Sequence, residues 1–498
     1  MSRRLVKLVL SLLVLVCGTT FAESLAERIW MRVSTDNFHL HSVLDEERTL
    51  ELLRTLEVMR SAFSDPDAAQ TFQAGVPTII VALDKEDDYR MLGVPASTVG
   101  IFIADARENA IVIQDNERVT AVRTILHEYV HYLLRQNGRV VYPKWYEEGN
   151  AEYLSSSRIH NGEFEYGLPL QGRIATLNFA AWMPLADILA VDDTNELESA
   201  AGDLFYAQAW LLVHYLNSLP DAEQHWDRRL QDYNQLLLEG LDPVAAFEAA
   251  FELSVETLED TLLKYFLAER FASRRIPVDT SLPNFAPRIT ELRQAQIEIV
   301  LARMAMRFHQ ESVAEDWFRS ALADEETRPS AEAGLGTIYG RRGDIDQAEA
   351  HFEAAIYLVS YDFRMWMDYA QFWAERLYSA ADREESALYA KRLEEALRNA
   401  LTISDATPEL NTLMGLAFLA QGKDVGEAIT FLQEAVQQSP IDQGSRLLLA
   451  SAYLHDYQPR RAIEIAESVL SFEHESNAAT ASAHELIDLA EAMLREQN

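Results

Sequence analysis

A repeat with a period of 34 residues runs through the second half of the chain. Large, small and aromatic residues recur in one phase at Leu301, Ala302, Ala314, Phe318 and Ala321, and again at Leu335, Gly336, Ala348, Phe352 and Ala355. A unit of this length is a helix pair that cannot bury its apolar face alone, so neighbouring units must stack. The period therefore predicts an all-α array over residues 290–498.

Two further copies and one irregular copy extend this pattern. The regular ones carry Met414, Gly415, Phe418, Ala428 and Ala435, and then Leu449, Ala450, Tyr453, Ala462 and Ala466. The irregular copy, from Trp366 to Ala400, is stretched around 379–388, and we expect residues 479–495 to form a capping helix. The spacing is typical of tetratricopeptide repeats, whose solenoids offer a groove to peptides or partner proteins. A helical spacer is the alternative, because a period reports architecture and not a ligand.

The first 22 residues predict a secretory signal peptide. A basic start is followed by an apolar run from Leu5 to Val16, and small residues lead to Ala22. The run is too short to span a bilayer, and its flanks match a cleaved signal. We therefore expect an exported chain. No later segment approaches membrane length, so we expect no stable membrane insertion after cleavage.

The cysteine usage bears on the cellular compartment of the chain, and its charge bears on the partners it can bind. Cys17 is the only cysteine and lies inside the signal, so the exported part can form no disulfide, which fits a bacterial periplasm. Val16 is not the small residue that a lipoprotein signal places before its cysteine, which argues against lipidation of Cys17. The formal net charge is −36, with 43 basic and 79 acidic residues. Such a surface repels nucleic acid and anionic lipid head groups.

Residues 29–285 mix strand and helix patterns and predict an α+β domain. Alternating residues predict a strand pair over 30–42, and helical spacing follows over 46–63. Short apolar runs predict strands over 76–83, 99–103 and 110–114, the last two forming a hairpin. A helix then follows, with Asp115 and Asn116 as candidate N-caps and a stop at Asn137–Gly138.

The sequence HEYVH lies on that helix. His127 and His131 are one turn apart on the same face, so two imidazoles can meet one metal ion. Glu128 lies between them and is placed to take a proton from metal-bound water. The alternative is a chance spacing in a chain with 12 histidines, with Glu128 as an ordinary solvated residue.

A second motif, WYEEGNAEY, occupies residues 145–153. Together the two motifs resemble the gluzincin peptidases, or peptidase MA-like domain, in which an HExxH helix is followed by a W-x-x-E-G-x-A-x-Y helix. The resemblance implies a zincin-like α+β fold for residues 29–285. It also implies Zn²⁺ bound by His127, His131 and Glu148, with Glu128 as general base.

Glu147 competes with Glu148 for the role of third ligand. Adjacent helical residues point about 100° apart, so only one of them can face the metal. Glu148 is favoured because Gly149 beside it permits close packing on the HEYVH helix. Glu152 lies one turn further along the same face, where it can accept the outer N–H of a ligating histidine. The alternative for Glu152 is an exposed helix acid.

Peptide hydrolysis also requires a group that stabilises the oxyanion. Gluzincins often supply a Tyr or His from a later helix, and the resemblance favours Tyr206, with a buried core tyrosine as the alternative. His214 and Tyr215 are the other candidates on this helix, and His160 lies in a polar loop.

Two more features bear on the site. We interpret His39 and His41 as residues of an exposed strand face, because no third ligand is near them in sequence. The strand 110–114, just before the metal helix, is expected to form the upper rim of the cleft, where an extended peptide would add as a further strand.

The sequence thus predicts a periplasmic zinc metallopeptidase followed by a tetratricopeptide solenoid that recruits a polypeptide substrate or a protein partner. An endopeptidase is favoured over an aminopeptidase, because no motif for gripping a free amino terminus is evident. The alternative is a scaffold or chaperone-like adaptor with a structural or vestigial zinc site. A hydrolase of polysaccharide or cell wall has no paired-acid or sugar-stacking motif here.

Overall fold

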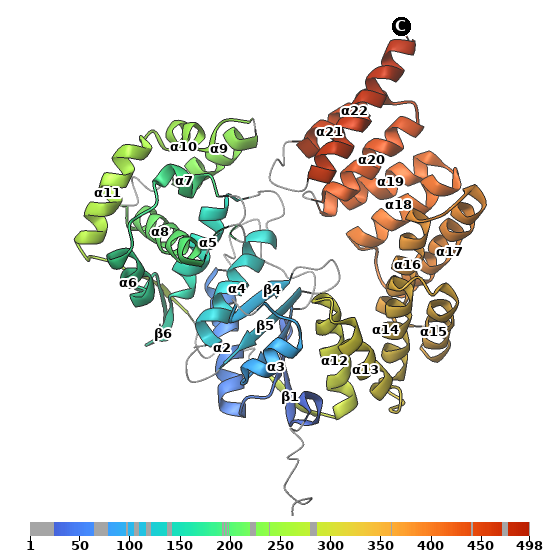
Figure 1. Ribbon diagram of the computed structural model, residues 1–498, viewed down its shortest axis with the longest axis horizontal. Helices are drawn as coiled ribbons and strands as arrows, with labels where there is room; N and C mark the ends of the chain where they lie inside the picture. Colours follow the sequence, from blue (N-terminus) through green and yellow to red (C-terminus); the bar gives the residue numbers. More distant parts are fainter. Residues whose placement is uncertain are drawn as a thin grey trace, which may run out of the picture.

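The computed structural model describes most of the chain after the predicted signal. Residues 1–22, with Cys17, and the predicted helix boundaries at 116 and 137–138 lie outside the described residues. The structure describes residues 24–63, 78–95, 98–103, 109–115, 121–136, 142–191, 194, 197, 199–219, 226–238, 240–278, 286–359, 361–439, 442–470 and 477–497. A central sheet has a group of helices on one side and a helical array on the other (Figure 1).

The central sheet has six strands in the order β4-β5-β3-β2-β1-β9. Their bounds are β1 Trp30–Ser34, β2 Phe38–Ser42, β3 Thr78–Leu83, β4 Gly100–Ile103, β5 Asn109–Gln114 and β9 Arg288–Leu292. Strands β2, β3 and β5 are parallel, whereas the β1/β2, β1/β9 and β4/β5 pairs are antiparallel. The predicted strand pair and hairpin are therefore confirmed, and β9 joins the sheet from far along the chain.

Both faces of the central strands of this sheet are covered. Helices α2 (Glu46–Phe63) and α4 (Ala121–Gln136) pack with Ile80 and Ile111 on one face. Helix α12 (Gln294–Arg307) packs with Val81 and Val112 on the other face, near α3 (Glu86–Met91). Because alternate residues of a strand point to opposite faces, one apolar run serves both layers.

Two expectations about individual strands are wrong. Strand β5 is flanked by β3 and β4, so the edge of the sheet is β4 and the predicted rim at 110–114 lies inside the sheet. The strand face that carries His41 is not exposed either. His41 lies on β2 near the centre of the sheet, and its side chain is 5% exposed. In both cases the sequence pattern indicates a strand but not which neighbours cover it.

A mainly helical group follows α4 and encloses a second core. Trp145, Trp210 and Phe247 are fully buried in it. Its helices are α5 Lys144–Ser155, α6 Gln171–Phe179, α7 Leu185–Leu189, α8 Ser199–Ser218, α9 Trp226–Leu238, α10 Pro243–Phe251 and α11 Val255–Leu267. A small antiparallel sheet accompanies it, with β6 Arg158–His160, β7 Glu163–Tyr166 and β8 Arg274–Pro277.

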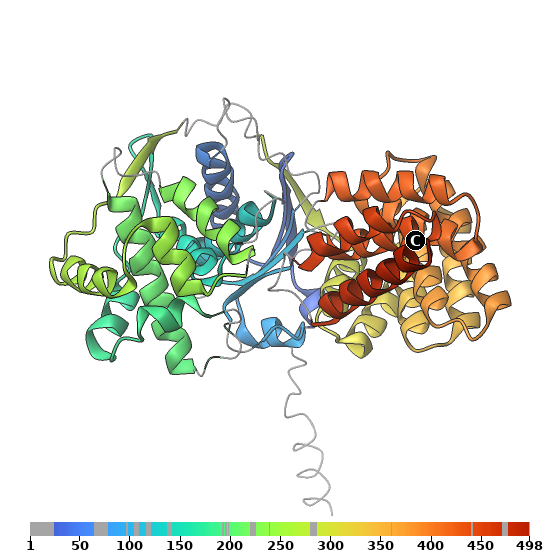
Figure 2. The same ribbon diagram turned by 90° about the horizontal axis from the view of Figure 1, so that it is seen from above.

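The array consists of helix pairs of the tetratricopeptide type (Figure 2). After α12 come α13 Glu311–Ala321, α14 Arg328–Arg341, α15 Ile345–Leu358, α16 Phe363–Tyr378, α17 Arg383–Leu401, α18 Pro408–Gln421, α19 Val425–Gln438, α20 Gln443–His455, α21 Pro459–Leu470 and α22 Asn477–Gln497. The repeat positions are buried as predicted: Leu335, Ala348 and Ala355 are fully covered. A Cβ on Gly336 would lie 2.9 Å from the Phe352 ring, which explains the small residue there.

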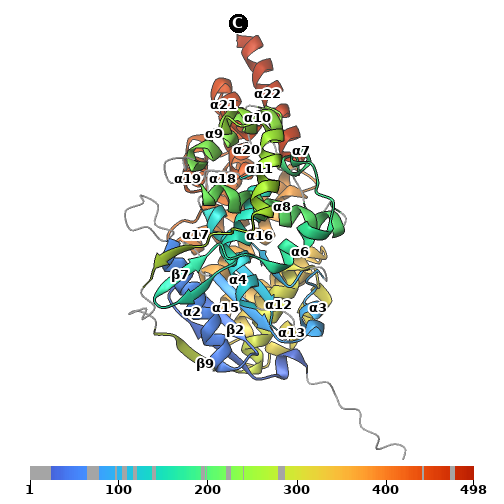
Figure 3. The same cartoon turned by 90° about the vertical axis from the view of Figure 1, so that its left-hand side faces the viewer.

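One pair in the middle of the array and the two ends of the array depart from the regular pattern. The irregular copy has a longer second helix, α17, with 19 residues against 14 in α15. Helix α22 packs on α20 and α21 at the end farthest from α12, as expected of a cap (Figure 3). At the other end, α12 shares its core with the sheet through Ile297, Leu301 and Met304. Among the described residues, no helix is both long and apolar enough for a membrane span.

Candidate metal centre

The two motif helices α4 and α5 pack against each other and bring three ligand atoms together. His127 Nε2 and His131 Nε2 are 3.2 Å apart, and each lies 3.4 Å from Glu148 Oε2. Tetrahedral zinc with bonds of about 2.0–2.1 Å separates its ligand atoms by about 3.3 Å. The three separations match a single tetrahedral ion. Among the described residues, His127, His131 and Glu148 form the group of metal-ligand side chains whose ligand atoms lie close enough together to hold one ion.

A buried oxygen with no hydrogen-bond partner points to the same conclusion. Glu148 Oε2 is buried and makes no hydrogen bond within the described part of the chain. Leaving a carboxylate oxygen in this state costs free energy, which an ion bound at that oxygen would recover. The side chains of His127 and His131 keep 16% and 13% of their surface exposed, so the centre is not sealed. The donor set and its setting fit Zn²⁺.

Glu148, and not Glu147, faces the imidazoles. Glu147 instead lies 3.5 Å from Lys144 Nζ at the start of α5. The expected reason for this choice is wrong, however. A Cβ on Gly149 would meet Ala209 O at 2.4 Å, so Gly149 permits close packing on α8 and not on α4. The side of α5 that carries Glu148 meets α4, while the side that carries Gly149 meets α8.

Lys144 is a site residue that the sequence analysis missed. Lys144 lies one turn before Glu148 on α5, and its Nζ is 2.9 Å from Glu148 Oε1. The other oxygen, Oε2, is the one that faces the two imidazoles. Burial alone would raise the pKa of Glu148, but His131, His127 and Lys144 lower it well below its usual range. Glu148 is therefore ionised, as a metal ligand must be. A Lys four residues before a Glu on a helix was the available signal.

Glu152 is buried, so the alternative interpretation of it as an exposed helix acid is wrong. Its carboxylate accepts a hydrogen bond from Arg173 Nη2 at 2.8 Å and another from Arg123 Nη2 at 2.5 Å. Its Oε1 lies 3.7 Å from His127 Nδ1. Burial would raise the pKa of Glu152, but Arg173, His127 and Arg123 lower it. The carboxylate beside the outer nitrogen of His127 is thus held in place by two arginines that the motif does not include.

Glu128 lies on the side of α4 that faces the edge strand β4. Its Oε2 accepts a hydrogen bond from the backbone N–H of Phe102, at 2.8 Å. Strand β4 can approach α4 closely because of Gly100, where a Cβ would lie 2.1 Å from Thr124 Cγ2. The predicted base therefore contacts the edge strand of the sheet.

Tyr206, on α8, lies near this centre. The guanidinium of Arg173 is 5.2 Å from the centre of its ring. Burial raises the pKa of Tyr206, and the negative charge of Glu148 raises it further, so the phenol keeps its proton at neutral pH. Tyr206 is half-buried and is not a fully covered core tyrosine.

The other candidate residues lie elsewhere. His214 is fully buried, with its nitrogens 2.8 Å from Tyr265 Oη and 3.0 Å from Gly167 O. Tyr215 packs on Tyr265, with ring centres 5.4 Å apart. His160 is exposed beside Asn161, and His39 Nδ1 lies 3.0 Å from Ser34 Oγ. None of these side chains belongs to the three-ligand group.

Comparisons with known proteins add little about this centre. No protein-family model matches the chain, and no curated protein matches it. Among solved structures, a thermophilic tetratricopeptide protein from Thermus thermophilus is 17% identical with a TM-score of 0.33, over 39% of this chain and 98% of that one. PilW, a type IV pilus biogenesis factor, is 19% identical with a TM-score of 0.32, over 41% and 92%. Yeast Tom70 is 13% identical with a TM-score of 0.31, over 75% and 73%. Likenesses this weak carry no argument about function.

Proposed function

We propose that this protein is a zinc-dependent peptidase whose helical array recruits a polypeptide substrate or partner. The observation that carries the proposal is the set of three separations near 3.3 Å among His127 Nε2, His131 Nε2 and Glu148 Oε2. The unpartnered oxygen of Glu148 and the exposure of the two histidines support it. The predicted signal peptide supports export to the periplasm.

The residues around the centre have separate roles in this proposal. His127, His131 and Glu148 would hold Zn²⁺, which supplies a Lewis acid and lowers the pKa of bound water. Glu128 would take a proton from the attacking water and pass it to the departing amine. Tyr206 would donate its phenol proton in a hydrogen bond to the developing oxyanion.

The edge strand β4 is the place for an extended substrate. A peptide that pairs with this strand would run past Glu128, which already contacts the backbone at Phe102. Main-chain pairing gives little sequence preference, so the expected substrate class is unfolded or extended polypeptide. Pairing along a strand also suits cleavage within a chain, which favours an endopeptidase.

The test compares zinc content and casein cleavage in the wild type, Glu128→Gln and Glu147→Gln. We expect all three to bind one equivalent of zinc. Glu128→Gln should lose at least about 100-fold in rate, because the general base is removed, whereas Glu147→Gln should keep its activity. Zinc at full occupancy with no cleavage by the wild type would overturn the proposal.

A protein-binding adaptor with a structural or vestigial metal site is the second candidate. Lys144 favours it, because an ammonium 2.9 Å from Glu148 Oε1 already offsets the carboxylate charge without any ion. If this candidate holds, a chelator should leave the melting temperature of the purified protein unchanged, or zinc should stabilise the fold while no peptide is cleaved. Zinc-dependent cleavage abolished by Glu128→Gln would exclude it.

A further inference from the structure

Arg173, on α6, contacts two of the residues that surround the metal centre. Its Nη2 donates a hydrogen bond to Glu152 Oε1 at 2.8 Å, and its Nε donates another to Glu152 Oε2 at 3.2 Å. Its guanidinium also lies over the ring of Tyr206, 5.2 Å from the ring centre. Glu152 belongs to α5 and Tyr206 to α8, so one side chain links two helices of the site.

A guanidinium group can make both contacts at once because it is planar. Its N–H groups point outward in the plane, where they match the two oxygens of a carboxylate, and its face is free to lie on an aromatic ring. The distance of 5.2 Å to the Tyr206 ring is within the range of about 6 Å over which a cation is attracted to such a ring. A lysine offers neither the fork nor the flat face.

The surroundings of Arg173 hold it in this position. Helix α6 packs on α8, and Arg173 Nη1 lies 3.7 Å from Asp203 Oδ1 on α8. Asp203 and Tyr206 are three residues apart and therefore share one face of that helix. The side chain of Arg173 is 20% exposed and that of Glu152 is 3% exposed. A side chain that is mostly covered and has three partners has little freedom to leave them.

Arg123, on α4, offers a comparison within the same site. It also donates a hydrogen bond to Glu152, but 45% of its side chain is exposed. Within the described part of the chain, no hydrogen bond, ion pair or cation–π contact joins Arg123 to Tyr206. Arg123 therefore shares the charge of Glu152 with Arg173 but does not share the link to α8.

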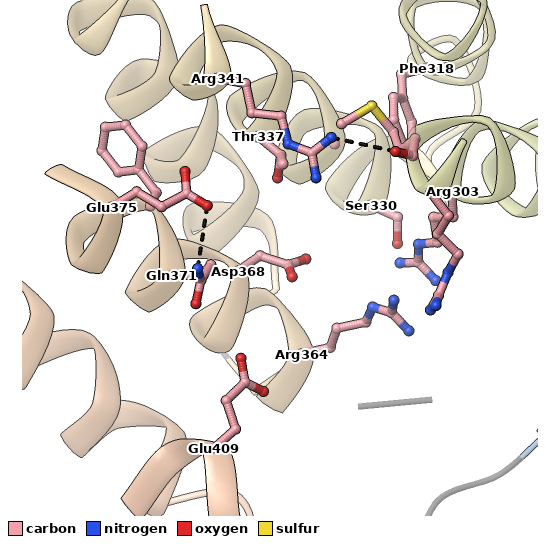
Figure 4. Close-up of a pocket in the computed structure, with 14 residues that line it drawn as sticks. Arg303, Phe318, Ser330, Thr337, Arg341, Arg364, Asp368, Gln371, Glu375 and Glu409 are labelled. Carbon is pink, nitrogen blue, oxygen red and sulfur yellow. Dashed lines mark hydrogen bonds between the residues drawn. The ribbon is translucent and has the colours of Figure 1, made fainter. Parts of the chain in front are cut away.

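The arginines of the array have a different setting. Four of them line a cavity of about 380 Å³ there (Figure 4). Arg341, for example, donates a hydrogen bond to the backbone oxygen of Met306 at 3.4 Å and lies 3.6 Å from Glu311. These partners belong to α12 and α13, so Arg341 joins neighbouring helices of the array and not the parts of one site.

We propose that Arg173 is a positioning residue that ties Tyr206 to Glu152 and, through Glu152, to His127. This role rests on the proposed peptidase function. Glu152 Oε1 lies 3.7 Å from His127 Nδ1, so the carboxylate that Arg173 holds in turn orients a zinc ligand. The phenol of Tyr206 and the imidazole of His127 thereby keep one mutual geometry. An oxyanion donor needs such a fixed place, because a displacement of about 1 Å can cost about 100-fold in rate.

The test measures zinc affinity by competition with a chromogenic chelator, and kcat and KM with a fluorogenic peptide. We expect Arg173→Lys, which keeps the charge but loses the fork, to lower kcat by about 10- to 100-fold with little change in KM. Arg173→Gln should also weaken zinc binding by about tenfold, because Glu152 is then held by one arginine instead of two. Wild-type kcat in Arg173→Lys, or wild-type zinc affinity in Arg173→Gln, would overturn the proposal.

A double-mutant cycle with Tyr206→Phe separates positioning from charge compensation. In the Tyr206→Phe background, Arg173→Lys should lower kcat by only about threefold or less, since the hydrogen bond that Arg173 positions is already gone. Arg123→Gln is the matched control, and its effect on kcat should be the same in both backgrounds. Equal effects of Arg173→Lys in the two backgrounds would contradict the link to Tyr206. A zinc-loaded wild type that cleaves nothing would instead overturn the peptidase function, and the zinc affinity of Arg173→Gln would still decide the link to His127.

Discussion

Glu147 and Glu148 are neighbours on α5, but only Glu148 reaches the two imidazoles. We expect Glu148→Gln to weaken zinc binding by well over tenfold, because the amide that replaces the carboxylate is a neutral, poorer ligand. Glu147→Gln should bind zinc as the wild type does, because Glu147 lies beside Lys144 and does not belong to the three-ligand group. Competition with a chromogenic chelator measures both. Equal losses in the two variants would mean that Glu148 is not the third ligand.

Tyr206 combines a position near Glu148 with a phenol that stays protonated. Tyr206→Phe should therefore lower kcat by about 10- to 1000-fold with little change in KM, because the lost hydrogen bond forms only in the transition state. Steady-state kinetics with a fluorogenic peptide give the two parameters separately. Tyr215→Phe is the control from the same helix, and equal effects of the two changes would assign Tyr206 a merely structural role.

At the scale of elements, the contact between α5 and α8 depends on Gly149. Gly149→Ala places a Cβ 2.4 Å from the backbone oxygen of Ala209, which cannot rotate away. We expect the free energy of unfolding to fall by about 1–3 kcal/mol. Gly202→Ala, on α8 with open space around it, should instead raise that free energy by about 0.5–1 kcal/mol. Urea unfolding compares them, and equal stabilities would contradict the packing.

Glu394 on α17 ties two neighbouring helix pairs together. It accepts hydrogen bonds from Arg398 at 2.8 Å, Lys423 at 2.8 Å and Gln421 at 2.9 Å. Burial alone would raise the pKa of Glu394, but these partners lower it to about 2. Because the folded pKa lies below the usual value of 4.5, the ionised carboxylate stabilises the fold above that value, and this stability is lost as the pH falls toward 2.

Urea unfolding of Glu394→Gln at neutral and acidic pH tests this ion network. At pH 7 the variant should be less stable by about 1–2 kcal/mol, since Arg398 and Lys423 are half exposed and screened by solvent. The difference from the wild type should shrink at pH 3. Glu395→Gln, whose side chain is exposed, should show no such pH dependence. A constant difference for Glu394→Gln would argue against an ionic cause.

At the scale of the whole molecule, the sheet and the array share one core through α12. A chain that ends after Leu292 loses Ile297, Leu301 and Met304 and leaves one sheet face uncovered. We expect it to be insoluble or unfolded. The apolar residues that α12 shields from water in the intact chain would be exposed in the shortened one. A chain that ends after Leu322 keeps α12 and α13 and should melt cooperatively. Equal solubility and melting of the two would show that the sheet does not require α12.

The local periods of the sequence determined the elements of this protein. The 34-residue period marked the buried positions of the array, and the four-residue spacing of His127 and His131 placed both imidazoles on one face of α4. These features follow from helix geometry, which depends on neighbours along the chain. The choice of Glu148 over Glu147 rested on the motif resemblance and on the packing expected at Gly149, and the structure places Gly149 against α8 instead.

Only the tertiary structure decided which elements meet. It placed β4 and not β5 at the sheet edge, brought Arg123 and Arg173 to Glu152, and set Gly149 against α8. It also brought Ile297, Leu301 and Met304 of α12 against the sheet, a placement that the repeat period does not encode. Contacts of this kind depend on the packing of segments distant in sequence, where burial, and not local spacing, selects the partner.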